Sequence, residues 1–118
     1  MKNEAVGLKR TFTAYEFSMK GLKSCYRSEA AFRQEVWLSL VLIPLALILG
    51  ESSVEKVLLI MVVFFVLILE ILNSAIESVV GRIGDDYHVL SGATKDMDSA
   101  SVWLSLMLLV VTWLIILI

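Results

Sequence analysis

Four polar residues follow one of the most apolar stretches of this chain, and their spacing places them on one side of a helix. Residues Val57–Leu69 are all apolar or aromatic, and the next segment reads Glu70-Ile-Leu-Asn73-Ser74-Ala-Ile-Glu77. Because successive helical residues turn by about 100°, Glu77 lies only about 20° around the helix from Glu70. An acid in the middle of a membrane helix costs about 2.5–3.5 kcal/mol on insertion scales. A helix that keeps two acids in one stripe is therefore predicted to use them.

Two more polar residues stand at the ends of other apolar stretches. Glu29 precedes the first stretch, Lys95 precedes the third, and Glu77 lies near the end of the second. Two carboxylates with water and phosphate oxygens commonly hold Mg²⁺, and a lysine at the same depth can neutralise phosphate charge. Glu70, about 10 Å deeper than Glu77 along its helix, lies in a less polar setting that suits a general base. The pattern fits phosphoryl transfer from a soluble nucleotide to a hydroxyl group in the bilayer.

The same residues leave two other interpretations open. Glu70 and Glu77 can instead pair with a cation or hydrogen-bond to a neighbouring helix, which is a purely structural role. A small proton-coupled exporter would use Glu70 as its proton carrier, but it would not need Glu29, Glu77 or Lys95, and it would have four spans. The sequence has neither a phosphate-binding loop of the G-x-x-x-x-G-K-[ST] type nor a glycine-rich kinase loop. A kinase built on this chain therefore follows neither common design.

Composition predicts an all-α integral membrane protein with a single domain over residues 1–118. Apolar residues make up 58% of the chain and its mean hydropathy is +0.85, above the roughly 45–50% of a typical soluble domain. We expect transmembrane helices near 30–49, 55–80 and 97–118, each close to the length that spans hydrocarbon. A soluble three-helix bundle fits poorly, because Val102–Ile118 contains no charge.

The first 28 residues have the pattern of an amphipathic helix that lies in the membrane interface. Apolar residues recur on one face at Leu8, Phe12, Tyr15, Met19, Leu22 and Tyr26. A neighbouring, mostly basic face contains Lys9, Glu16, Lys20, Lys23 and Arg27. A third stripe is small, which favours close packing on a transmembrane helix, and consists of Ala14, Ser18, Gly21 and Cys25. The simplest alternative is a lipid anchor with no further role.

Charge distribution predicts the orientation of the spans. Seven of the ten Lys and Arg residues precede residue 34, whereas the link Gly50–Lys56 contains Glu51, Glu55 and one lysine. By the positive-inside rule the N-terminus and the second link face the cytoplasm, and the C-terminus faces the other side. No basic and aromatic pattern suggests nucleic acid as a partner.

At these residues the chain resembles the small bacterial integral-membrane diacylglycerol kinases. The similar strings are Glu29-Ala-Ala-Phe-Arg-Gln-Glu35, Glu70-Ile-Leu-Asn-Ser-Ala-Ile-Glu77, and Leu90-Ser-Gly through Lys95-Asp96-Met97. The resemblance covers essentially the whole chain, and the second string is highly specific.

This resemblance implies an enzyme of the bacterial inner membrane that transfers the γ-phosphoryl group of ATP to diacylglycerol, giving phosphatidic acid. It implies a Mg²⁺ cofactor, a homotrimer with active sites shared between subunits, a cytoplasmic N-terminus and a periplasmic C-terminus. A kinase for a polyprenol such as undecaprenol is the nearest alternative, because its acceptor is also a primary alcohol.

The resemblance also implies roles for individual residues. Glu70 matches the catalytic base, and Glu29 and Glu77 match the magnesium ligands. Nucleotide contacts are implied for Arg10, Phe17, Glu29, Glu77, Asp86, Tyr87, His88, Lys95 and Asp96. Contacts with the lipid substrate are implied for Glu70, Asn73, Arg33, Glu35, Ser99 and Trp113.

Four positions depart from the pattern of that family. Tyrosine is usual where Phe17 stands, aspartate at Gly81, arginine at Ala93 and glycine at Asp98. These departures concern the details of nucleotide contact. They leave the reaction as expected, because the acids and the lysine that carry it are all present.

Overall fold

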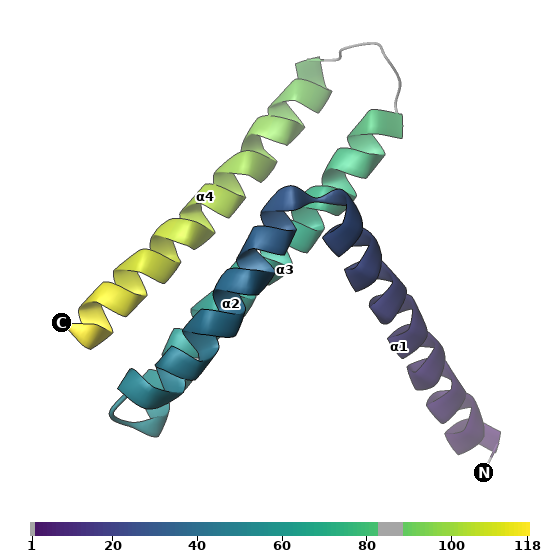
Figure 1. Cartoon of the computed structure of the whole chain (residues 1–118). Coiled ribbons are helices and arrows are strands. Elements are labelled where there is room, and N and C mark those ends of the chain that lie inside the picture. The colour runs from purple at the N-terminus through teal and green to yellow at the C-terminus, as the bar shows by residue number, and fades with distance from the viewer. Residues whose placement is uncertain (1, 83–88) are drawn as a thin grey trace.

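The computed structural model describes residues 2–82 and 89–118, with side chains over 6–81 and 92–118, and these residues are almost entirely helical. Four helices follow in order: α1 (Lys2–Ser28), α2 (Ala30–Leu49), α3 (Ser53–Arg82) and α4 (Val89–Leu117). Helix α3 packs against both α2 and α4, whereas α1 leaves the bundle at an angle (Figure 1).

Three of these helices are long and apolar enough to cross a membrane, namely Ala30–Leu49, Ser53–Gly81 and Gly92–Leu117. The all-α fold with three spans after an N-terminal helix is therefore confirmed. Helix α4 begins earlier than expected, so Ser91 and Gly92 lie inside it rather than before it. One glycine costs a helix only about 1 kcal/mol relative to alanine, and Gly92 is buried.

The turn between α2 and α3 is tight and well capped. The backbone N–H of Glu55 donates to Ser52 Oγ at 3.2 Å, and the N–H of Glu51 donates to Glu55 Oε1 at 3.3 Å. Ser52 is thus the N-cap residue of α3. A Cβ atom on Gly50 would lie 2.6 Å from Lys56 Cγ and 2.9 Å from the Ala46 carbonyl oxygen. Only glycine fits this turn without a shift.

The corner between α1 and α2 is held by side chains from both spans that follow it. Arg33 Nη1 donates to the carbonyl oxygens of Tyr26 and Arg27, each at 2.8 Å, and so satisfies the exposed end of α1. The buried Cys25 places its Sγ 3.5 Å from Ser74 Oγ on α3. The last turn of α1 is therefore docked on the bundle.

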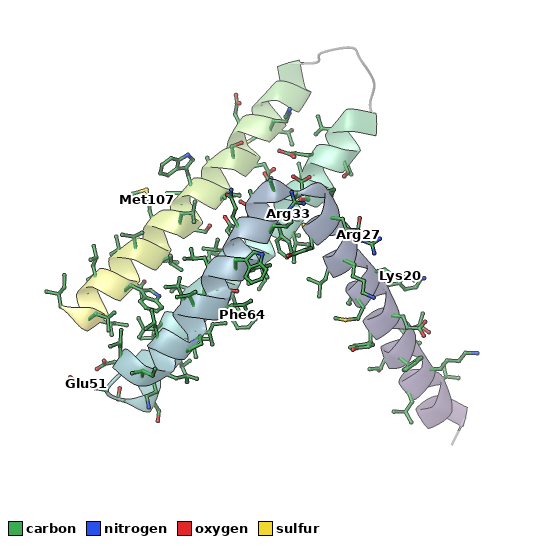
Figure 2. The ribbon with its side chains drawn as sticks, viewed as in Figure 1. Lys20, Arg27, Arg33, Glu51, Phe64 and Met107 are labelled. Atoms are coloured by element: carbon green, nitrogen blue, oxygen red, sulfur yellow. The ribbon has the colours of Figure 1, made fainter. Side chains whose placement is uncertain are left out.

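Small and aliphatic residues form the narrow core between the spans. Ala46, Leu59, Val63 and Val66 are buried between helices, and Ser105 brings α4 close with only 1% of its surface exposed. On the outside, large apolar side chains such as Phe64 and Met107 point away from the bundle (Figure 2). A bundle with an apolar exterior and a thin core suits a lipid environment.

Candidate active site

One of the two buried acids among the described residues lies at the centre of the polar part of the bundle. Glu70 lies on α3 with only 6% of its surface exposed. It interacts electrostatically with Glu29 at the α1–α2 corner, Glu77 on α3 and Asp98 on α4, and directly with Glu35 on α2. We refer to these five residues as the carboxylate cluster. Glu70 therefore faces acids from the α1–α2 corner, from α2 and from α4.

Glu35 and Glu70 form the closest pair in the cluster. Their carboxyl groups are near enough to share a side-chain hydrogen bond across the α2–α3 interface. Two ionised carboxylates have no donor to offer each other, and Glu35 Oε2 is buried without a partner in the described part of the chain. A hydrogen bond in this pair therefore needs a proton on one of the two groups.

Asp98 is a site residue that sequence reasoning missed. It is 7% exposed, and its backbone carbonyl accepts a hydrogen bond from Ser101 Oγ at 2.7 Å. Its carboxyl group lies close enough to Glu70 to repel it. The available signal was an acid beside an apolar stretch, at a position where the resemblance leads one to expect glycine.

Glu29 and Glu77, for which the resemblance implies a metal ion, both lie within electrostatic reach of Glu70. Glu29 occupies the N-cap position of α2, yet its side chain makes no capping hydrogen bond, which leaves both oxygens for other ligands. No group of three His, Cys, Asp or Glu side chains with metal-binding geometry occurs among the described residues. Two hard carboxylate donors still fit Mg²⁺, because this ion usually keeps several waters and binds substrate phosphates as well.

Residues expected at the nucleotide lie outside the buried part of the cluster. Lys95 and Asp96 are exposed on α4 about one turn before Asp98. Arg10 and Phe17 are exposed on α1, and Arg10 lies about 27 Å along that helix from its last residue, at 1.5 Å per residue. A further three expected nucleotide contacts fall outside the described residues: Asp86, Tyr87 and His88.

Residues expected at the lipid are spread along the bundle. Asn73 is half-buried one turn from Glu70, and Ser99 is exposed beside Asp98. Trp113 Nε1 instead donates to the Leu59 carbonyl at 3.2 Å, about 16 Å from Glu70 along α3. The guanidinium of Arg33 is bonded to the end of α1. The structure thus places Asn73 and Glu35 near Glu70 and gives Trp113 and Arg33 contacts elsewhere.

Similarity to known proteins decides the family. The family profile described as prokaryotic diacylglycerol kinase matches residues 16–117. The chain is 47% identical over 117 residues to a diacylglycerol kinase of Escherichia coli strain K12, covering 99% of this chain and 96% of that protein. It is 44% identical over 110 residues to a diacylglycerol kinase of Haemophilus influenzae, covering 93% of each. The chain belongs to the prokaryotic diacylglycerol kinase family.

Membership in the prokaryotic diacylglycerol kinase family agrees with the three candidate membrane spans. A third relative, from Pseudomonas aeruginosa, is 47% identical over 107 residues, covering 91% of this chain and 87% of that protein. The chain is thus a multi-pass membrane protein of a lipid kinase family.

Proposed function

We propose that this chain is an ATP-dependent diacylglycerol kinase that converts diacylglycerol to phosphatidic acid. The observation that carries the proposal is Glu70, an acid buried in an apolar bundle and surrounded by four other acids. Family membership supplies the reaction class, since the relatives are themselves diacylglycerol kinases.

In the proposed reaction Glu70 accepts the proton of the acceptor's primary hydroxyl. The hydroxyl oxygen then forms a bond to the γ-phosphorus while the bond from that phosphorus to the bridging oxygen of ADP breaks. Glu35 supports the base, because its direct contact with Glu70 fixes the position of the carboxyl group. Asn73, one turn away on the same helix, is available to orient the lipid.

Charge on the phosphates is the main catalytic problem in such reactions. Glu29 and Glu77 would hold Mg²⁺, which when bound neutralises charge on the β- and γ-phosphates. Lys95 is exposed and makes no ion pair among the residues that the structure describes, so its ammonium group is available to the same phosphates. Asp96 lies beside it toward the nucleoside.

The length of α1 supports active sites shared between subunits of a homotrimer. Arg10 lies about 27 Å from the α1–α2 corner, and α1 points away from its own bundle (Figure 1). A contact between Arg10 and nucleotide therefore belongs to the site of a neighbouring chain. In the bacterial inner membrane, α1 lies at the cytoplasmic interface and the C-terminus lies in the periplasm, as the distribution of basic residues predicts.

Transfer of labelled γ-phosphate from ATP tests the proposal. Purified protein in mixed micelles is offered diacylglycerol and undecaprenol in parallel, with and without Mg²⁺. We expect Mg²⁺-dependent label in phosphatidic acid and little in the polyprenol product. Preference for undecaprenol would overturn the assigned acceptor, and transfer to neither by folded protein would overturn the kinase assignment.

A further inference from the structure

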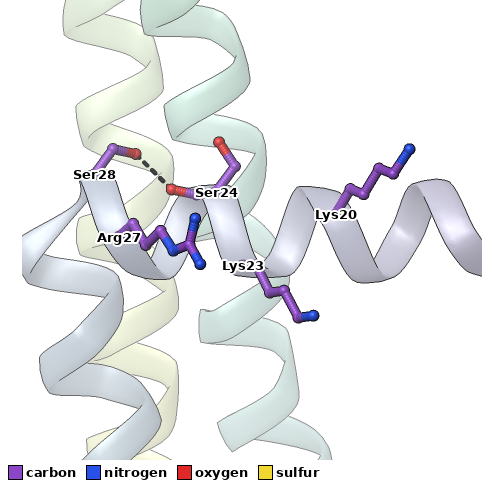
Figure 3. Close-up of a pocket in the computed structure, with 5 residues that line it drawn as sticks. All are labelled: Lys20, Lys23, Ser24, Arg27 and Ser28. Atoms are coloured by element: carbon purple, nitrogen blue, oxygen red, sulfur yellow. Dashed lines mark hydrogen bonds between the residues drawn. The ribbon is translucent and has the colours of Figure 1, made fainter.

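The α1–α2 corner has a concentration of positive charge that the proposed reaction does not use. A pocket of about 410 Å³ on α1 is lined by Lys20, Lys23, Ser24, Arg27 and Ser28 (Figure 3). All five residues are exposed, and no acidic side chain lines the pocket. We refer to it as the basic pocket. Three cations without an acid favour a ligand of net negative charge.

The cations of the basic pocket have few competing partners. Lys20 Nζ lies 5.7 Å from the centroid of the Phe17 ring, which is a weak cation–π contact at an exposed site. Lys23 and Arg27 form no ion pair within the described ranges. The backbone beneath them is fixed, because Arg33 bonds to the Arg27 carbonyl at 2.8 Å. The charges are thus held on an ordered part of α1.

An apolar hollow adjoins the basic pocket and shares two of its residues. It has a volume of about 310 Å³ and lies in the angle between α1 and α2. Its lining consists of Leu22, Lys23, Tyr26, Arg27, Phe32 and Val36. Lys23 and Arg27 therefore stand on the boundary between a cationic surface and an apolar surface. A molecule that joins a phosphate to an acyl chain has this same division.

We propose that the α1–α2 corner binds an anionic membrane phospholipid, with its phosphate in the basic pocket and its acyl chain in the apolar hollow. Charge complementarity selects this occupant. A zwitterionic headgroup would bring its own cation against three others, diacylglycerol has no charge to match, and a nucleotide has no acyl chain for the hollow. Binding needs neither ATP nor turnover, so the proposal stands or fails independently of the proposed reaction.

Native mass spectrometry of the full-length protein in detergent, without nucleotide, tests this site. Phosphatidylglycerol and phosphatidylcholine are titrated in parallel, and the bound lipids per chain are counted. We expect tighter binding of phosphatidylglycerol. Removing all three charges together (K20Q, K23Q and R27Q) is expected to weaken that binding about 100-fold, or roughly fivefold per charge. K9Q is the matched control, because it removes an exposed lysine of the same helix outside the pocket, and it should leave binding unchanged.

Four results would overturn the site. These are equal binding of the two lipids, unchanged binding in the triple variant, equal weakening by K9Q, and displacement of the lipid by pyrophosphate or ATP. The last result would assign the pocket to a nucleotide. Glycerol phosphate, which is a headgroup without chains, should fail to compete. Competition from it would show that the apolar hollow contributes nothing to binding. Circular dichroism and oligomer size establish that each variant is folded.

Discussion

The carboxylate cluster and helix α1 differ in how much of each is covered by its own chain. Glu70 and Asp98 are almost fully buried where the spans pack together. Arg10 and Phe17 are exposed on a helix that packs on the bundle only near its C-terminal end, at Cys25. The groups proposed to handle the proton are assembled by one chain, whereas the proposed nucleotide contacts on α1 need another surface. We infer that a single chain supplies the acceptor side of the site, and that a neighbour completes the nucleotide side.

Replacement of Glu70, the proposed base, should have the largest effect on turnover. Glu70→Gln keeps the shape of the side chain but cannot accept a proton, so turnover should fall by about 10²–10⁴-fold. Binding of MgATP, measured by equilibrium binding to the same preparation, should change little because Glu70 lies below the nucleotide side. A parallel loss of binding and turnover would contradict the separation of the two regions.

The Mg²⁺ dependence of activity tests whether Glu77 belongs to the nucleotide side of the site. Glu77→Gln removes one of two carboxylate donors, so the Mg²⁺ concentration for half-maximal rate should rise about tenfold or more, since each ligand contributes substantially to the affinity of such a site. Glu51→Gln is a suitable control, because it neutralises an exposed acid at the opposite end of the bundle. An unchanged Mg²⁺ requirement in Glu77→Gln would reject the assignment.

Glu35 tests whether the base is positioned from α2. Glu35→Gln retains a hydrogen-bonding group but not the acid, and kcat should fall on the order of 10–100-fold, the usual result of a small misplacement. The KM for ATP should stay the same, because Glu35 contacts Glu70 and not the nucleotide residues. A rise in that KM with unchanged kcat would show that Glu35 serves a different function.

Replacement of Asp98 should have the smallest effect, and it should stabilise the protein rather than impair it. Its buried carboxyl group repels Glu70, so Asp98→Ala should raise the free energy of unfolding by about 1–3 kcal/mol, the usual cost of burying an unpaired polar group. Thermal denaturation in detergent measures this change, with Ser99→Ala as the exposed neighbouring control. A lower midpoint for Asp98→Ala would mean that the carboxyl group has a stabilising partner.

The fold and the polar stripe on α3 could be predicted from the sequence because both are local. Apolar length defines a span, and a spacing of seven residues puts Glu70 and Glu77 on one face whatever the helix packs against. The Glu35–Glu70 contact depends on how two helices are rotated about each other, which spacing alone does not specify. Asp98 stands out in the sequence as an unusual acid, but its approach to Glu70 depends on helix rotation for the same reason. The stripe of small residues on α1 was expected to pack on a transmembrane helix. Cys25 is buried in this way, whereas Gly21 has nothing within 4 Å of an added Cβ.

Mixing two inactive chains tests the shared site most directly. Glu70→Gln and Arg10→Ala are each expected to lose most turnover alone. Reconstituted together in equal amounts, they should recover about a quarter of the wild-type rate if every site takes its base from one chain and Arg10 from the next around a cyclic oligomer. Glu70→Gln mixed with Glu77→Gln should recover nothing, because both changes lie on one helix. Failure of the first pair to recover, in oligomers shown to contain both chains, would contradict a site divided between α1 and the bundle of a neighbour.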